Sequence, residues 1–404
     1  MAWNRPVNHS VNAPVRALVL AGGGARGSYQ VGVWRALTEL GWRPGIITGT
    51  SVGSLHGAMF ALDLYETARD MWLTIRSQDV MELPEQNADL SELHAFLRDV
   101  VRQGGMDVSP LEEIVERVLD EDALRASPIR LGLVTVEQRG LKARELALDD
   151  IPHGKVKDYL LASAACFPAL RAHIIDGVSY LDGGYRDNMP TALAQKMGAD
   201  ELVCVDLEGV GITRPNRTGL PTTLIRSYWE LGDILHFDPD TARRNMELGY
   251  YDTRRAMGYL RGCAYAVSTS AESCEDAAAF AWKFQQVQKA VREKYPVTLT
   301  ADAALLLAKM KDADLAPLEA AAEDAGVDPT KFYTTHTLAD AFLATCDQAR
   351  MQSFAPLFEG SADAARAALA ALVPNTFLQA LVWYTLTAPE KTPILPEVTD
   401  DEGV

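Results

Sequence analysis

Two short apolar runs and the helix between them constrain the fold more than any other feature of the sequence. The runs RALVL at 16–20 and GIITGT at 45–50 are bounded by glycine, and a helical pattern extends from Ser28 to Leu40. This arrangement is typical of a βαβ unit, in which two parallel strands are joined by a right-handed crossover. The sequence therefore predicts an α/β fold.

Sequence patterns typical of helices and strands continue along the chain to about residue 210, and mainly helical patterns follow. A second helix is predicted from Val52 to about Ile75, and SPLEEIVERVL begins another at Ser109. The segment IRLGLVTVEQRGLKARELAL predicts a hairpin around Arg139 and Gly140, and strands follow near VSYLDGG and ELVCVDL. From about residue 220, including PTTLIRSYWELGDILHF, helical signals dominate. We expect a central, mostly parallel sheet flanked by helices, with a mainly helical C-terminal region.

The distribution of charged residues also distinguishes the C-terminal region from the rest of the chain. The 404 residues carry a formal net charge of −17, and residues 297–404 hold 6 Lys and Arg against 16 Asp and Glu. This imbalance predicts a solvated, mostly helical C-terminal region. The predicted organisation is an N-terminal extension (1–14), an α/β domain (15–210), a helical segment that completes or covers it (211–296), an acidic helical region (297–392) and a disordered tail (393–404).

Composition excludes several classes of protein. The negative net charge argues against a nucleic-acid binder, which presents basic surface to a polyanion. It also disfavours attraction of the whole chain to anionic lipid, but it leaves room for a local basic patch. Five cysteines without a CxxC pair indicate neither a disulfide framework nor a zinc site. No apolar signal segment is evident, and Pro374 interrupts the uncharged stretch 367–389, so we expect a cytoplasmic protein. We also expect a protein that uses no metal or cofactor.

The glycine-rich stretch AGGGARG after the first strand admits several interpretations. Gly22, Gly24 and Gly27 satisfy the G-x-G-x-x-G pattern of a dinucleotide site, but TGTS stands where the acidic residue of that site is expected. The stretch does not match the P-loop pattern either, because Ser28 and Tyr29 stand where Lys and Ser or Thr are needed. A tight turn alone explains one or two glycines but not three in succession.

The pentapeptide GTSVG supports a further interpretation. It has the G-x-S-x-G pattern of a nucleophile elbow, in which a sharp strand-to-helix turn exposes the hydroxyl of Ser51 while Gly49 and Gly53 avoid a backbone clash. Thr50 and Val52 complete this predicted turn. Because the pentapeptide and the glycine loop follow consecutive strands of one βαβ unit, both loops open at the same edge of the sheet.

The glycine loop suits the charge that ester hydrolysis creates. Attack on an ester carbonyl places negative charge on its oxygen, and backbone N–H groups fixed around that oxygen stabilise it. Glycines allow this close approach, and the positive end of the following helix adds to the effect. We predict an oxyanion loop over 22–27, with donors at Gly23 and Gly24 and a further candidate at Ala25. Arg26 either braces this loop or is solvated.

A serine nucleophile needs a base, and the histidines are poor candidates. His56 lies about 140° around the helix from Ser51, so its side chain is predicted to point away from the nucleophile. Only His236 and His336 have the position along the chain that a Ser-Asp-His triad requires. Each is more commonly an ordinary surface histidine or one near a helix end.

Asp182 in YLDGGYRDNMP is the better candidate for the base. It ends a predicted strand, and Gly183 and Gly184 follow it, so it is either a simple turn former or a carboxylate placed beside the two other loops. In the second case Asp182 takes the serine proton directly. Asp187 and Asn188 are expected to hold the turn rather than to react.

Together, GGGARG, GTSVG and DGG, in this order and at these separations, resemble the patatin-like phospholipases. The resemblance covers about residues 15–210 and includes ASAACFPAL before the acidic motif and DNMPTALAQKMGAD after it. It implies a sheet flanked by helices, a Ser-Asp dyad without histidine, and hydrolysis of acyl esters in phospholipids, lysophospholipids or neutral lipids. On the matching positions, Ser51 is the implied nucleophile, Asp182 the implied base and 22–27 the implied oxyanion hole.

A lipid or acyl-ester substrate requires apolar surface near the site, and it implies transient contact with a membrane surface. Candidates are the segments 222–237 and 376–386, although aromatic and aliphatic residues at helical spacing usually belong to a core. Other functions stay open at this point. They are transfer of the acyl group to an alcohol, a Ser-Asp-His esterase, and a catalytically silent lipid-binding or scaffold protein that keeps the fold.

Overall fold

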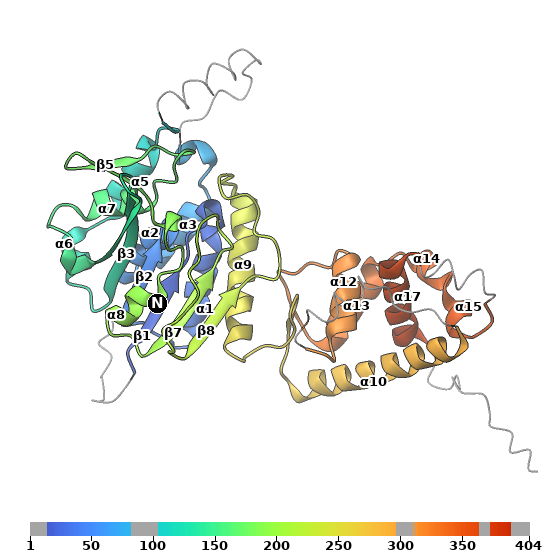
Figure 1. Cartoon of the computed structure of the whole chain (residues 1–404). Helices are drawn as coiled ribbons and strands as arrows, with labels where there is room; N and C mark the ends of the chain where they lie inside the picture. The colour runs from blue at the N-terminus through green and yellow to red at the C-terminus, as the bar shows by residue number, and fades with distance from the viewer. Residues whose placement is uncertain (1–13, 82–103, 296–309, 311, 363–371, 389–404) are drawn as a thin grey trace, which may run out of the picture. The chain divides into compact units, whose positions relative to one another are not determined.

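The chain divides into two compact units, residues 1–257 and 258–404. This division falls inside the predicted segment 211–296. The first unit is an α/β structure and the second is mainly helical (Figure 1). The computed structural model describes residues 14–81, 104–295, 310, 312–362 and 372–388.

A mixed eight-stranded sheet forms the centre of the first unit, in the order β5-β6-β3-β2-β1-β7-β8 with β4 beside β3. The strands are β1 (Arg16–Leu20), β2 (Ile46–Thr50), β3 (Arg130–Glu137), β4 (Lys142–Ala147), β5 (His173–Ile175), β6 (Val178–Asp182), β7 (Glu201–Asp206) and β8 (Thr222–Arg226). The five strands β3-β2-β1-β7-β8 are parallel, and β4, β5 and β6 pair in antiparallel fashion. The predicted mostly parallel sheet is confirmed, as is the hairpin that joins β3 to β4.

Helices cover both faces of this sheet (Figure 1). Leu18 and Leu20 of β1 belong to a large core that includes residues of α1, α2, α3 and α9, whereas Ala17 and Val19 belong to a smaller core with α8. This alternation follows from the two-residue period of a strand. The helices of the first unit are α1 (Ser28–Glu39), α2 (Val52–Ala61), α3 (Tyr65–Trp72), α5 (Ser109–Val118), α6 (Glu121–Arg125), α7 (Val156–Ser163), α8 (Thr191–Lys196) and α9 (Pro239–Ala256).

Helix α9 packs along α1 at a separation that only glycine permits. A Cβ atom on Gly32 would lie 1.8 Å from the carbonyl oxygen of Met246, and one on Gly249 would lie 2.1 Å from that of Tyr29. The buried Tyr29 hydroxyl also donates a hydrogen bond of 2.7 Å to Asp252. Helix α9 is therefore an integral part of the α/β unit, although it lies beyond the predicted domain limit at residue 210.

Two predicted elements are wrong. The helix predicted over 52–75 is interrupted after α2, where Asp63 takes a φ of 59° and a second helix, α3, follows. The start of the segment predicted as helical from residue 220 is the strand β8, which pairs with β7 and buries Ile225. Pairing with a neighbouring strand overrides the local helical pattern there.

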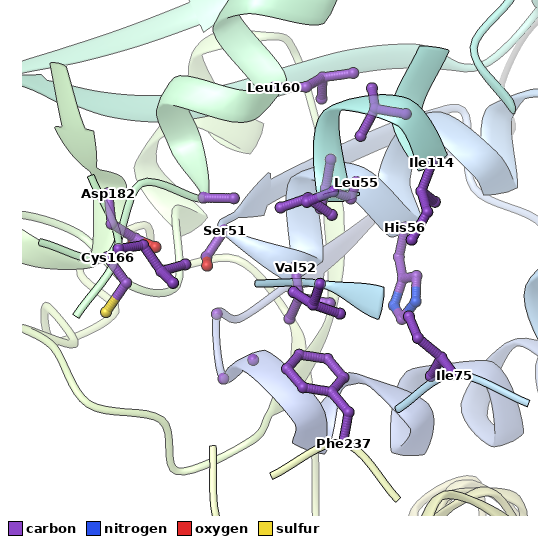
Figure 2. A pocket seen from close by; sticks show the side chains of 18 of the residues that line it. Ser51, Val52, Leu55, His56, Ile75, Ile114, Leu160, Cys166, Asp182 and Phe237 are labelled. Atoms are coloured by element: carbon purple, nitrogen blue, oxygen red, sulfur yellow. The ribbon is translucent and has the colours of Figure 1, made fainter. Parts of the chain in front are cut away.

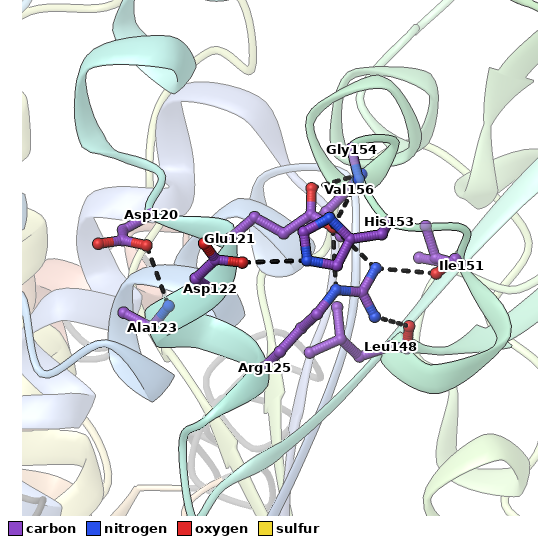
Figure 3. Close-up of polar contacts among 10 residues, drawn as sticks. All are labelled: Asp120, Glu121, Asp122, Ala123, Arg125, Leu148, Ile151, His153, Gly154 and Val156. Carbon is purple, nitrogen blue, oxygen red and sulfur yellow. Dashed lines mark hydrogen bonds and ion pairs between the residues drawn. The ribbon is translucent and has the colours of Figure 1, made fainter.

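A polar cluster anchors the chain that leads into α7 (Figure 3). The Arg125 side chain of α6 donates to the carbonyl oxygens of Leu148 and Ile151, at 3.1 and 2.8 Å. Glu121 accepts the backbone N–H of Gly154 at 2.9 Å and forms an ion pair with Arg125. Because the cluster joins α6 to the loop before α7, it fixes where α7 begins.

The second unit contains a short parallel pair of strands and several helices. Its elements are β9 (Ala266–Val267), α10 (Ala271–Lys294), α12 (Ala316–Asp324), β10 (Phe332–Tyr333), α13 (Thr335–Thr345), α14 (Gln348–Gln352), α15 (Ala355–Phe358) and α17 (Pro374–Thr387). The segment 376–386, one of the two candidates for lipid contact, lies in α17 with Phe377 and Leu381 buried. Among the described residues, no helix is both long and apolar enough to cross a bilayer.

Candidate active site

Ser51 occupies a sharp turn between β2 and α2. Its backbone has φ 55° and ψ −131°, a conformation that is costly for a residue with a side chain. Gly49 and Thr50 end β2, and Val52 and Gly53 begin α2. The predicted strand-to-helix turn is therefore present, with the serine at its apex.

Ser163, at the end of α7, holds this turn. Its hydroxyl accepts the backbone N–H of Ser51 at 3.0 Å and donates to the carbonyl oxygen of Val134 at 2.7 Å. The strained turn is thus tied to β3 through one fully buried side chain. Sequence reasoning missed Ser163, since it lies 112 residues from Ser51 and no motif links the two positions.

Asp182 lies near Ser51 because β2 and β6 both pair with β3 and end opposite neighbouring residues of that strand. Thr50 of β2 lies opposite Val134, and Asp182 of β6 lies opposite Thr135. Ser51 and Asp182 line the same pocket, their oxygens face each other in Figure 2, and Ser51 has a lowering effect on the pKa of Asp182. The sequence placed these two residues in separate loops, and the sheet brings them together.

Burial raises the pKa of Asp182 to about 6, against the opposing effects of hydrogen bonds from Ser51 and from the Gly184 N–H. The Gly184 bond is 2.7 Å long, and the Asp182 side chain is almost completely buried. Desolvation disfavours the charged carboxylate, so it binds a proton more readily than an exposed aspartate does. Such a carboxylate can accept a proton near neutral pH and return it.

The glycine loop lies beside Ser51, with Gly24–Gly27 forming one short 3-10 turn. Gly24 has a φ of 54°, and a Cβ there would lie 2.1 Å from the carbonyl oxygen of Ile234. The same carbonyl accepts the N–H of Ala25 at 2.8 Å, so this predicted donor is engaged in the present conformation. The N–H groups of Gly23 and Gly24 form no hydrogen bond to another described residue.

Arg26 and Asn188 hold the loop from two sides. The Arg26 guanidinium donates to the carbonyl oxygens of Leu207, Glu208 and Gly232, at 2.7 to 3.1 Å. The side-chain amide of Asn188 donates to the Gly22 carbonyl oxygen at 3.2 Å, and the backbone carbonyl of Asn188 accepts the Gly22 N–H at 3.3 Å. Arg26 therefore braces the loop, one of the two roles considered for it.

His56 is buried in a hydrogen-bond relay that leaves no nitrogen for Ser51. Trp72 donates to its Nε2 at 2.8 Å, which makes Nδ1 the protonated nitrogen that bonds to Gln30 at 2.8 Å. Gln30 donates in turn to the carbonyl oxygen of Ala21, next to the glycine loop. Burial lowers the pKa of His56 to about 3, so the ring is neutral.

An apolar pocket opens at Ser51 and Asp182 (Figure 2). It extends along α2, where Leu55, Met59 and Leu62 line it at successive turns. Eleven residues separate Ser51 from Leu62, which corresponds to about 16 Å of helix. Ile234 and Phe237 of the predicted lipid-contact segment also line the pocket, whereas the segment's Leu231 is buried in the core. No cluster of metal-binding side chains occurs in the described ranges.

Fold and site define an α/β protein in which a serine at a strand-to-helix turn and a buried carboxylate line one apolar pocket. Residues 18–194 match the family model described as patatin-like phospholipase. This part of the chain is a patatin-like phospholipase domain, and it lies within the predicted α/β domain.

Relatives match about half of the chain. Patatin-like phospholipase domain-containing protein 7 of Rattus norvegicus is 30% identical over 200 residues, which cover 47% of this chain and 13% of the relative. Lysophospholipase NTE1 of Phaeosphaeria nodorum is 28% identical over 214 residues, which cover 50% of this chain and 12% of the relative. The chain thus spans about one eighth of the length of these curated relatives. The crystal structure of VipD from Legionella pneumophila covers 95% of this chain and 93% of its own at 13% identity, with a TM-score of only 0.36.

Proposed function

We propose that this protein is a serine acyl-ester hydrolase of the phospholipase A or lysophospholipase type. The placement of Ser51, at the apex of a strained turn, and the buried Asp182 in one apolar pocket is the observation that carries the proposal. The patatin-like domain and the names of its relatives support a lipid as substrate. The pocket accommodates one acyl chain, because its length along α2 is close to half of a bilayer's roughly 30 Å hydrocarbon thickness.

The proposed reaction has two steps. Ser51 Oγ attacks the ester carbonyl carbon, its proton passes to Asp182, and the Gly23 and Gly24 N–H groups stabilise the oxyanion. Asp182 gives the proton to the departing alkoxide, which leaves an acyl-enzyme. Asp182 then removes a proton from water, which attacks the acyl carbon and releases the fatty acid as the proton returns to Ser51.

The alternatives receive less support. Within the described residues, neither Ser51 nor Asp182 has a hydrogen bond to a histidine, which disfavours a Ser-Asp-His esterase. Of the two triad candidates, His236 is exposed and His336 belongs to the second unit. The placement of Ser51 and the buried Asp182 in one pocket also disfavours a silent scaffold. Acyl transfer uses the same first step, and analysis of products in the presence of an added alcohol distinguishes it from hydrolysis.

Labelling with a fluorophosphonate probe tests the proposal. Wild-type protein should be labelled and should release fatty acid from lysophospholipid, whereas Ser51→Gly, which tolerates the positive φ, should do neither. Asp182→Asn should lose hydrolysis by roughly 10²-fold or more. The matched control is Asp176→Asn, at an exposed turn position with φ 49°. Undiminished turnover by Asp182→Asn would show that Asp182 is not the base of a Ser-Asp dyad. Labelling of Ser51→Gly would show that Ser51 is not the nucleophile.

A further inference from the structure

Three loops of the first unit meet beside the mouth of the pocket. They are the β3–β4 turn (138–141), the turn after Asp182 (183–187) and the loop after β7 (208–217). Ile212 of the third loop donates its N–H to the Gly184 carbonyl at 2.7 Å. Arg186 of the second donates to the carbonyl of Leu141 in the first, also at 2.7 Å. We call the outer side of these three loops the mouth surface.

Large apolar side chains project from the mouth surface into solvent. Val210 is 78% exposed and also lines the pocket, so it stands at the entrance itself. Ile212 is 52% exposed and Leu141 is 42% exposed. Apolar side chains grouped beside a binding site commonly mark a contact with a protein or a membrane.

The same loops are positively charged within a strongly acidic chain. The three loops contain four Arg against one Asp and one Glu, and Lys142 follows the first loop, whereas the whole chain has a net charge of −17. Among the described residues, Arg139, Lys142 and Arg217 are exposed and form no ion pair with a carboxylate. Exposed apolar side chains and unpaired cations on the same group of loops suit the surface of an anionic bilayer.

We propose that the mouth surface docks this protein on anionic phospholipid and positions the pocket entrance at the lipid. The inference rests on the proposed lipid hydrolysis, because it identifies how the substrate reaches Ser51. It replaces the two sequence-based candidates for membrane contact with a third location. In this arrangement Val210 and Ile212 enter the headgroup region while Arg139, Lys142 and Arg217 contact lipid phosphates.

Vesicle sedimentation with the full chain carrying Ser51→Gly tests the docking without digesting the lipid. Binding should be stronger to phosphatidylcholine vesicles containing phosphatidylserine than to pure phosphatidylcholine, and salt should weaken it. Leu141→Glu with Ile212→Glu should lower binding at least tenfold. Arg139→Gln with Arg217→Gln should lower it by about fivefold per charge. Controls are Leu224→Glu on β8, 48% exposed, and Arg243→Gln on α9.

A second measurement separates this inference from the proposed function. In chains that keep Ser51, the Leu141→Glu and Ile212→Glu pair should retain hydrolysis of a soluble short-chain ester while hydrolysis of vesicle lipid falls. Failure of wild type to bind anionic vesicles, or equal loss in the control variants, overturns the docking but leaves ester hydrolysis standing. Normal vesicle binding without fluorophosphonate labelling overturns the proposed function instead.

Discussion

At the scale of single residues, the raised pKa of Asp182 makes the proposed activity dependent on pH. The base must be ionised to accept the serine proton, and burial raises its pKa to about 6. We therefore expect kcat/KM for a soluble ester to rise with pH through an apparent pKa near 6 and then to level off. Initial rates measured between acidic and neutral pH check this. A rise in kcat/KM near the ordinary pKa of an exposed aspartate would contradict this expectation.

Ionisation of Asp182 should raise the proposed activity but lower the stability of the folded protein. Because the folded pKa of Asp182 lies above its unfolded value, its contribution to stability is present below the unfolded pKa and is lost as the pH rises through about 6. At neutral pH, Asp182→Asn should therefore raise the free energy of unfolding, by about 3 kcal/mol. Urea denaturation at acidic and neutral pH measures the change, with Asp176→Asn as the control. Equal effects at both pH values would exclude this explanation.

The sequence predicts the residues that are proposed to react and names Arg26 as a possible brace, whereas the partners that hold these residues in place cannot be predicted from it. Ser51 and Asp182 lie in short motifs whose spacing indicates strand ends, and the exclusion of His56 as the base followed from helix geometry. Ser163, Arg26 and the Ile234 carbonyl act across more than 100 residues of chain. Their partners are set by tertiary packing, which local pattern does not contain.

At the scale of elements, close packing between two loops makes Gly24 irreplaceable. An Ala side chain there would be strained by the φ of 54° and would meet the Ile234 carbonyl oxygen at 2.1 Å. Gly24→Ala should displace the glycine loop and lower kcat about 100-fold, since the predicted oxyanion donors move. Gly41→Ala is the matched control, because Gly41 has φ 71° but open space around its Cβ position. Equal rates for both variants would contradict a role for the loop contact.

The elements that the sequence mispredicted are those whose identity depends on a distant partner. The segment at 222–226 has no strong strand pattern of its own, and it becomes β8 because β7 offers a free edge. The helix predicted over 52–75 was correct in type but not in continuity. The break at Asp63 lies in a stretch, ALDLYE, without the Gly or Pro that usually marks a helix end.

At the scale of the whole molecule, every described residue that lines the pocket belongs to the first unit. So do the side chains that brace the glycine loop and the helix α9 that packs along α1. A unit with its own core can fold alone. We therefore expect the reaction as proposed to require nothing from the described residues beyond 257.

A chain that ends at Met257 should fold and keep the proposed activity. We expect fluorophosphonate labelling of Ser51 and hydrolysis of a soluble short-chain ester at the rate of the full chain. A chain that ends at Asp238 is the matched control, because it lacks α9 and leaves the buried Tyr29 without its partner Asp252. It should be insoluble or lose its cooperative thermal transition. If the chain ending at Met257 folds but is not labelled, the second unit contributes to the site.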